Sequence, residues 1–143
     1  MMHQDAAVKE FMVAMGSAHD IDFRTDQDFM YLKRVLDLQL DLINEEYEET
    51  MQALYAIRMD LHNKRNPDRQ ALIELADGIA DLKYVLSHCA NAMSIDSERA
   101  FEIVHKSNMS KVGLDGKVTR DPRNGKVLKP NNYQPPILWE CIK

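Results

Sequence analysis

The sequence predicts an all-α protein, a bundle of four main helices followed by a short extended or hairpin C-terminal tail. Two observations lead to this prediction. Before residue 113, only Gly16, Pro67 and Gly78 could interrupt a helix, and such a scarcity of breakers favours long helices. In the same region apolar residues recur every three or four positions, which is the spacing of one helix face.

Each helix is expected from its apolar pattern and from a residue that can start it. Asp26 can cap the second helix with its side chain, and Asp96 can cap the fourth. Pro67 suits the first turn of the third helix, where its missing N–H is not needed. The expected helices cover about residues 5–17, 26–61, 67–93 and 96–110.

The sequence changes character after Gly113. Asp115-Gly116 and Asn124-Gly125 are turn dipeptides, which predict a short hairpin or an extended arm. We therefore expect a helical domain over residues 1–112. Residues 113–143 are expected to form a basic extended tail that packs on the same domain or on a neighbouring subunit.

The composition is that of an ordinary globular protein. Hydrophobic residues make up 45% of the chain and charged residues 29%, which excludes a disordered chain, a collagen or a disulfide scaffold. No apolar stretch is long enough for a membrane span, and the N-terminus lacks a signal-peptide pattern. Cys89 and Cys141 form no metal-binding or redox motif. We expect a cytoplasmic protein with free thiols and no membrane partner.

Charge is distributed unevenly along the chain. Residues 1–105 carry 10 Lys and Arg against 20 Asp and Glu, whereas residues 106–143 carry 8 against 3. An acidic body with a basic tail suits a site that binds a metal ion together with phosphate. The alternatives are a tail that contacts nucleic acid, against which the acidic body argues, and a tail that only neutralises the body.

The length of the second helix bears on assembly. About 35 residues span roughly 50 Å, whereas a compact domain of this size has a radius of gyration of only about 15 Å. Such a helix protrudes unless a second subunit covers it, so we expect a homodimer or homotetramer. The alternative is a helix broken near residues 42–44.

Two groups of acidic residues stand out. Glu45, Glu46 and Glu49 fall within an arc of about 100° on the second helix, close enough to repel one another. On the third helix Glu74, Asp77 and Asp81 share a stripe that continues through Tyr84, His88 and Asn91. If the two groups face each other, their repulsion calls for divalent cations, and oxygen ligands favour Mg²⁺ or Mn²⁺. The alternative is that both groups form solvated faces.

The acidic pattern resembles that of the all-α nucleotide pyrophosphohydrolases, the MazG-like and phosphoribosyl-ATP pyrophosphohydrolase-like group. That group carries EExxE followed, some tens of residues later, by ExxD. Here Glu45-Glu46-x-x-Glu49 matches the first half, and Glu74-x-x-Asp77 matches the second. A second register makes Asp81 the motif aspartate, with Gly78 in place of the motif glutamate; Asp77 belongs to the site in either register.

The tail extends the resemblance to the smaller, often phage-encoded branch of the group. The matching segments are Val104–Lys111, Asp115–Lys117, Gly125–Pro130 and Tyr133–Pro136. The resemblance implies a dimeric or tetrameric helical bundle that uses Mg²⁺, or Mn²⁺ in its place. Its reaction would cleave a nucleoside triphosphate to the monophosphate and pyrophosphate, and the phage-like tail favours dGTP or GTP.

Roles follow for particular residues under this interpretation. Glu46 is the expected general base, and Glu49 shares the catalytic work. Metal binding is expected of Glu45, Glu46, Glu49, Asp77 and Asp81, with Glu74 as the other candidate. Substrate phosphates and the nucleoside are expected to contact Asn108, Lys111, Lys106, Tyr84, Arg120 and Lys126.

Two other functions remain open at this point. The chain could be a non-enzymatic helical interaction module whose basic tail binds a partner. It could also be a pyrophosphohydrolase of the phosphoribosyl-ATP or dUTP type.

Overall fold

The computed structural model describes residues 2–143, and it confirms the all-α prediction. These residues contain no β-strand, only two isolated β-bridges. The chain divides into two compact units, one ending at Ser94 and one covering Ile95–Lys143. The helices are α1 (Gln4–Met15), α2 (Phe29–His62), α3 (Arg69–Ala92), α4 (Ser97–Met109) and the short 3₁₀ helix η1 (Trp139–Cys141).

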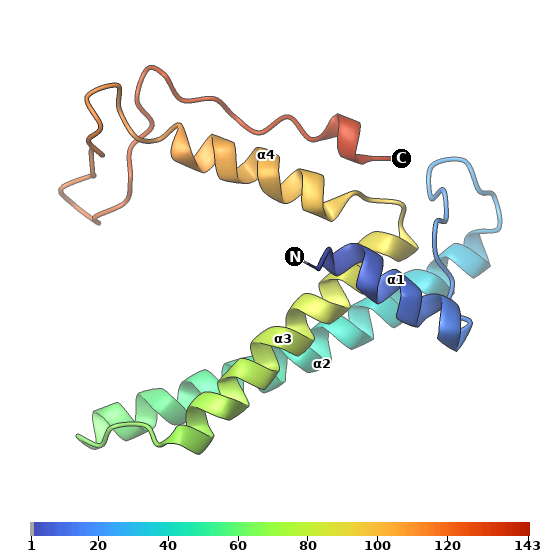
Figure 1. Ribbon diagram of the computed structural model, residues 1–143, viewed down its shortest axis with the longest axis horizontal. Helices are drawn as coiled ribbons and strands as arrows, with labels where there is room; N and C mark the ends of the chain where they lie inside the picture. Colours follow the sequence, from blue (N-terminus) through green and yellow to red (C-terminus); the bar gives the residue numbers. More distant parts are fainter. Residues whose placement is uncertain (1) are drawn as a thin grey trace. The chain divides into compact units, whose positions relative to one another are not determined.

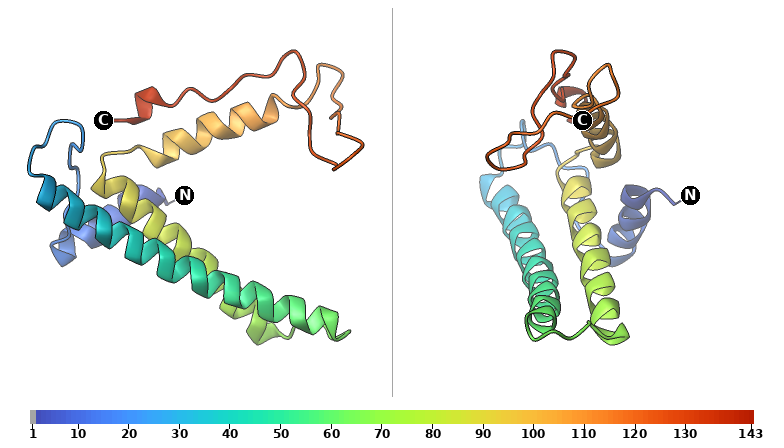
Figure 2. Two further views of the ribbon diagram at one scale, coloured as in Figure 1. Left: turned by 180° about the vertical axis from the view of Figure 1, so that it is seen from behind. Right: turned by 90° about the vertical axis from the view of Figure 1, so that its left-hand side faces the viewer.

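The first unit is built on an antiparallel hairpin of α2 and α3 (Figure 1). Helix α2 runs without a break for 34 residues, so the alternative of a helix interrupted near residues 42–44 is wrong. Helix α1 packs across α3, with α2 on the other side of α3 (Figure 2, right). Within residues 2–143, none of the helices combines the length and apolarity that crossing a bilayer requires.

Aspartates cap α2, α3 and α4, and the caps of α2 and α3 differ from the expected residues. The cap of α2 is Asp28, whose side chain accepts from the N–H of Tyr31; Asp26 instead accepts from the N–H of Asp28. The cap of α3 is Asp68, so Pro67 precedes the helix rather than entering its first turn. Asp96 caps α4 as predicted.

The apolar core of the first unit gathers at one end of the hairpin, which we call the proximal end. Met12 of α1 is completely buried there, together with Ala92 at the end of α3. The remaining members of this core are Val8, Ile21, Leu32 and Val35. The first turns of α2 and the last turns of α3 are therefore held by three helices and a loop.

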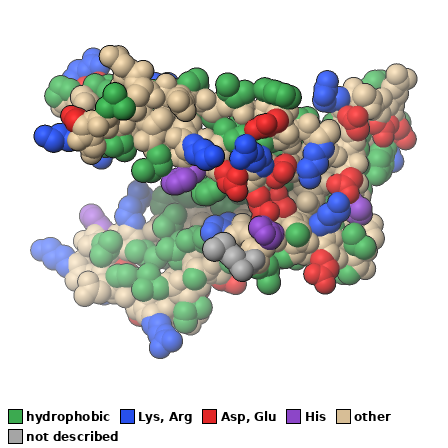
Figure 3. All heavy atoms as spheres, turned by 45° about the horizontal axis from the view of Figure 1, so that its top comes forward, with side chains coloured by type: hydrophobic (Ala, Val, Ile, Leu, Met, Phe, Trp, Pro, Cys, Tyr) green, Lys and Arg blue, Asp and Glu red, His purple; other side chains and the backbone are tan. Residues whose placement is uncertain are grey.

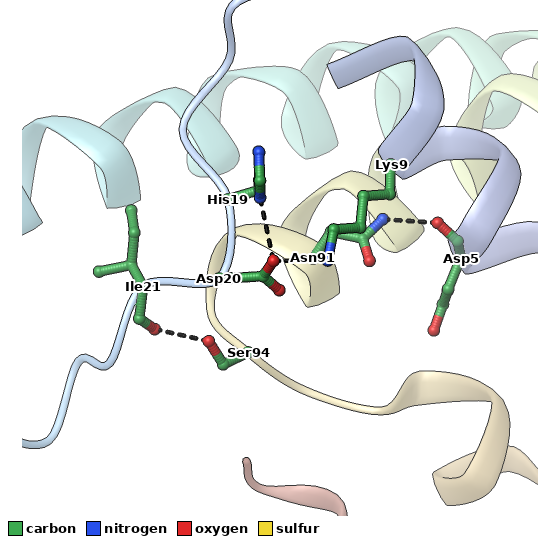
Figure 4. Close-up of polar contacts among 7 residues, drawn as sticks. All are labelled: Asp5, Lys9, His19, Asp20, Ile21, Asn91 and Ser94. Atoms are coloured by element: carbon green, nitrogen blue, oxygen red, sulfur yellow. Dashed lines mark hydrogen bonds and ion pairs between the residues drawn. The ribbon is translucent and has the colours of Figure 1, made fainter. Parts of the chain in front are cut away.

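Polar contacts fasten α1 and the loop after it onto the end of α3 (Figure 4). The amide nitrogen of the Asn91 side chain donates to the Asp5 carbonyl oxygen at 2.8 Å, and the Ser94 hydroxyl donates to the Ile21 carbonyl oxygen at 3.0 Å. Asp20 pairs with Lys9 and His19. Burying these backbone groups with partners closes the proximal end without leaving them unsatisfied.

The opposite end of the hairpin, residues 51–77, has no buried residue, and we call it the distal end. Its large apolar side chains are about half exposed, and apolar side chains are visible at the surface in Figure 3. They are Leu54, Tyr55, Met59, Leu61, Leu72 and Ile73. Only the pairing of α2 with α3 holds this end together within the first unit.

The second unit consists of α4 and the tail. The Asn132 side chain donates to the carbonyl oxygens of Ser110 and Val112 at 3.3 and 3.1 Å, and the Asp96 N–H donates to the Cys141 carbonyl oxygen at 2.8 Å. The tail binds α4 in this way, and together they form the unit that covers Ile95–Lys143.

The turn prediction within the tail is confirmed. Arg120 and Val127 form a β-bridge, and Gly125 has a positive φ of 73° between them. Glycine adopts this conformation at no steric cost. Further along, η1 buries Cys141 and leaves Trp139 77% exposed, and both cysteines of the chain are free thiols, as expected.

Candidate active site

In the middle of the hairpin, negatively charged side chains of α2 and α3 lie near enough to affect the pKa of one glutamate, Glu46. The side chain of Glu46 is half-buried, and its Oε2 atom is buried without a hydrogen-bond partner in residues 2–143. Burial raises the pKa of Glu46 above its ordinary value, and nearby negative charges raise it further. Those charges belong, in decreasing order of influence, to Asp81, Glu49, Glu45 and Asp77.

We call Glu45, Glu46, Glu49, Asp77 and Asp81 the acidic cluster. Every influence acting on the Glu46 carboxyl disfavours its charged form. A buried charged oxygen without a partner is costly. The carboxyl therefore has two ways to be satisfied: it takes up a proton, or a cation neutralises the cluster.

The donor chemistry of the acidic cluster fits a hard divalent cation. All its ligand atoms are carboxylate oxygens, which Mg²⁺ and Mn²⁺ prefer, and Glu46 offers one oxygen that is buried and unpaired. Within residues 2–143, however, no three or more His, Cys, Asp or Glu side chains are grouped to hold a metal ion as they stand. The magnesium site stays a prediction.

Glu74 and Asp81, the two less secure members of the predicted site, lie in different surroundings. Asp81 is half-buried and is the strongest of the negative charges acting on Glu46. Glu74 is exposed and is not among those charges. Which of the two completes the motif stays a prediction.

Gly78 allows the two helices to approach closely beside the acidic cluster. A methyl group in its place would lie 2.9 Å from Thr50 Oγ1 and 3.2 Å from Thr50 Cα, closer than normal contact. The Thr50 hydroxyl in turn donates to the carbonyl oxygen of Glu46 at 2.7 Å. This contact joins the turn that carries Glu46 and Glu49 to the turn that carries Asp77 and Asp81.

Thr50 did not stand out in the sequence, and neither did its pairing with Gly78. The available signal was the unusual place of Gly78 in the middle of a long helix, where glycine costs about 1 kcal/mol relative to alanine. A glycine retained at such a position often has a packing reason.

A buried polar pair lies between the acidic cluster and the proximal core. His88 Nδ1 lies 2.7 Å from Gln39 Oε1, and Gln39 Nε2 donates to the Val35 carbonyl oxygen at 3.3 Å. Since the Gln39 nitrogen is the donor in that bond, its oxygen accepts, and His88 Nδ1 carries the proton. Burial lowers the pKa of His88, which favours the neutral ring.

The sequence placed His88 on the polar stripe of α3 but did not reveal its partner. Gln39 is only 2% exposed. Its position in the apolar pattern of α2, between Val35 and Ile43, was the signal that could have indicated a buried glutamine.

The other predicted substrate-binding residues are distributed over both units. Tyr84, on α3, packs edge-on against Phe11 of α1 with ring centres 5.7 Å apart. In the second unit, Lys111 Nζ donates to Asn108 Oδ1 at 2.9 Å, and Arg120 donates to the Gly125 carbonyl oxygen at 2.9 Å. Lys106 and Lys126 are exposed. Their contacts with a substrate stay predictions.

The fold and the acidic cluster together define a class: an all-α protein that collects carboxylates along a helical hairpin. The chain belongs to the phosphoribosyl-ATP pyrophosphohydrolase family, whose model matches residues 8–108. The match covers the acidic cluster and most of α1 to α4, and it confirms the resemblance to this group of pyrophosphohydrolases. No curated protein is significantly similar to the chain.

Proposed function

We propose that this protein is a Mg²⁺-dependent nucleoside triphosphate diphosphatase. Its reaction would add water across the anhydride between the α- and β-phosphates, releasing the nucleoside monophosphate and pyrophosphate. The observation that carries the proposal is Glu46, whose buried, unpaired oxygen lies under the influence of four further carboxylates. Membership of a pyrophosphohydrolase family supports it.

Different members of the acidic cluster would have different tasks. Glu45, Glu49, Asp77 and Asp81 would hold Mg²⁺ or Mn²⁺. A bound divalent cation supplies charge neutralisation for phosphate oxygens and acidifies water. Glu46 would accept the proton of the attacking water, because its carboxyl lies under the influence of the carboxylates that would hold the cation.

Donors outside the acidic cluster would bind the phosphates. Asn108 and Lys111 are the first candidates, and Lys106, Arg120 and Lys126 follow. Lysine and arginine supply positive charge where the leaving pyrophosphate gains negative charge.

Two substrate preferences are distinguishable within this proposal. The phage-like tail favours dGTP or GTP, whereas the family favours phosphoribosyl-ATP. Steady-state kinetics across the eight common ribo- and deoxyribonucleoside triphosphates and phosphoribosyl-ATP would rank them by kcat/KM. No release of pyrophosphate from any of these substrates would contradict the proposed function.

Two variants test the role of the acidic cluster. Glu49→Gln and Asp77→Asn should fold normally but lose Mg²⁺-dependent release of pyrophosphate. Glu48→Gln is the matched control, because Glu48 is an exposed neighbour that does not act on Glu46. Mg²⁺ should also raise the Tm of the unaltered protein, since a ligand that binds only the folded state stabilises it. Full activity in both variants would remove these residues from the site.

We also propose that the protein is a homo-oligomer in which a second copy covers the distal end. Exposed apolar patches of this extent are typical of interaction surfaces, and Leu54, Met59 and Leu61 are each at least 43% exposed. Light scattering coupled to size exclusion would measure the mass. Leu54→Glu should reduce it, whereas Gln52→Glu, at another exposed position of α2, should not.

A further inference from the structure

A pocket of about 350 Å³ lies between α1 and α3. Its α3 wall includes Ala76 and Ala80, which are roughly half a helical turn away from Gly78, the residue in contact with α2. The pocket is therefore on the side of α3 that faces α1. It is partly open to solvent, and most of its lining is apolar: Ala7, Val8, Ala76, Ile79 and Ala80.

Two residues of the pocket's α3 wall are next in sequence to members of the acidic cluster. Ala76 and Ala80 immediately precede Asp77 and Asp81, and successive residues of a helix are turned by about 100°. One turn further on, Tyr84 lines the pocket and also continues the stripe of Asp77 and Asp81. A ligand in the pocket can therefore extend around the side of α3 toward the carboxylates.

The size and lining of the pocket suit a nucleobase. The volume would hold about twelve water molecules at roughly 30 Å³ each. A purine has about ten heavy atoms, so the pocket is large enough for one. Small-molecule sites are typically apolar with a few polar groups that fix orientation. Here Gln4, Lys83 and Ser87 supply polar groups, and Tyr84 supplies an aromatic ring.

We infer that the α1–α3 pocket binds the base of a nucleoside triphosphate whose phosphates extend to the acidic cluster. This inference rests on the proposed function. The apolar walls hold the flat base by contact, and Lys83 and Gln4 donate to acceptor atoms at its edge. The adjoining acidic cluster makes a nucleotide the favoured occupant, because one molecule then reaches both features.

A variant that fills the pocket tests the inference. Ala80→Leu should raise KM for the preferred nucleoside triphosphate by about tenfold or more with little change in kcat, since the base contributes equally to substrate and transition-state binding. Ala76→Leu, one turn earlier, is a second filling variant. Ala6→Leu is the control, because Ala6 is an exposed residue of α1 outside the lining.

Thermal shifts separate the pocket from the acidic cluster. Mg²⁺ alone should raise the Tm of Ala80→Leu as it does that of the unaltered protein, whereas the shift caused by the nucleoside monophosphate should be lost. If the unaltered protein releases pyrophosphate but both filling variants keep the KM of Ala6→Leu, the pocket assignment is wrong. If the unaltered protein releases none, the proposed function fails instead, and the monophosphate shift still decides whether the pocket binds nucleosides.

Discussion

The two ends of the α2/α3 hairpin share the same helices but differ in what surrounds them. At the proximal end, α1 and the loop after it complete an apolar core in which Met12 and Ala92 are fully buried. At the distal end, no residue from 51 to 77 is buried. Two helices alone cannot enclose a core, because each has only one neighbour against which to pack.

The acidic cluster lies where these two environments meet. Thr50 is the last buried residue of α2, and Gly78 is the first buried residue of α3. Carboxylates at this boundary can be partly desolvated by the packed side while remaining accessible to solvent and ligands. The packed core of the proximal end thus fixes the positions of the two helices, and the distal end leaves their side chains exposed.

The largest expected difference in stability is between replacing a methionine at the proximal end and replacing one at the distal end. Met12→Ala should destabilise the protein by about 2–5 kcal/mol, because it leaves a cavity in the proximal core. Met59→Ala, at a side chain that is 58% exposed, should cost about 0.5 kcal/mol or less at concentrations where the protein is monomeric. Urea unfolding followed by far-UV circular dichroism measures both. Equal losses would mean that the two ends are equally packed.

Removing one partner of the buried polar pair should have the next largest effect. Gln39→Ala leaves His88 Nδ1 without its acceptor and should cost about 1–3 kcal/mol. Gln52→Ala, at an exposed position near the distal end, is the control and should change stability little. A neutral effect of Gln39→Ala would show that water replaces the lost oxygen.

Gly78→Ala tests the close contact between α2 and α3 where the proximal and distal ends meet. Alanine gains up to about 1 kcal/mol in helix propensity, but the contact with Thr50 should cost about 1–3 kcal/mol. The expected net loss is therefore about 1 kcal/mol, with a larger loss of pyrophosphate release because the carboxylates of α2 and α3 move apart. Adding Thr50→Ala removes the closest clashing atom and should restore part of the stability; no restoration would contradict the contact as the cause.

The smallest expected effect is the contribution of His88, in the proximal half, to the pH dependence of stability. Burial lowers the pKa of His88 below its ordinary value of 6.5, so the unfolded chain binds more protons than the folded protein at mildly acidic pH. Stability should be complete above about pH 6.5 and fall as the pH drops below it. Unfolding measured at pH 7.5 and pH 5.5 should show a smaller drop for His88→Gln than for the unaltered protein.

Much of the fold could be predicted from local rules. The scarcity of glycine and proline and the apolar spacing correctly predicted four helices, because these features act within single helical turns. The start of α2 differed by a few residues because Asp26 and Asp28 are both competent caps, and the choice depends on the preceding loop. The boundary between the two units depends on contacts such as Asn132 with Val112, which no local pattern encodes.

The candidate site could be predicted in part for the same reason. Helical periodicity predicts that Glu45, Glu46 and Glu49 lie on one side of α2, whereas the carboxylates of α3 that act on Glu46 depend on the register of α2 against α3. That register is set by the approach of Thr50 to Gly78 and by the pairing of Gln39 with His88, whose members are 28 and 49 residues apart in the chain. Contacts over such separations leave no periodic trace in the sequence.

The position of Trp139 determines what fluorescence can measure. It is the single tryptophan of the chain, and it lies in the second unit with most of its ring in water. Because the indole is already in water and lies outside the first unit, its emission gives no direct signal of the unfolding of the hairpin and its core. Introducing a Phe23→Trp reporter next to the proximal core, in a Trp139→Phe background, would give the first unit an optical signal of its own.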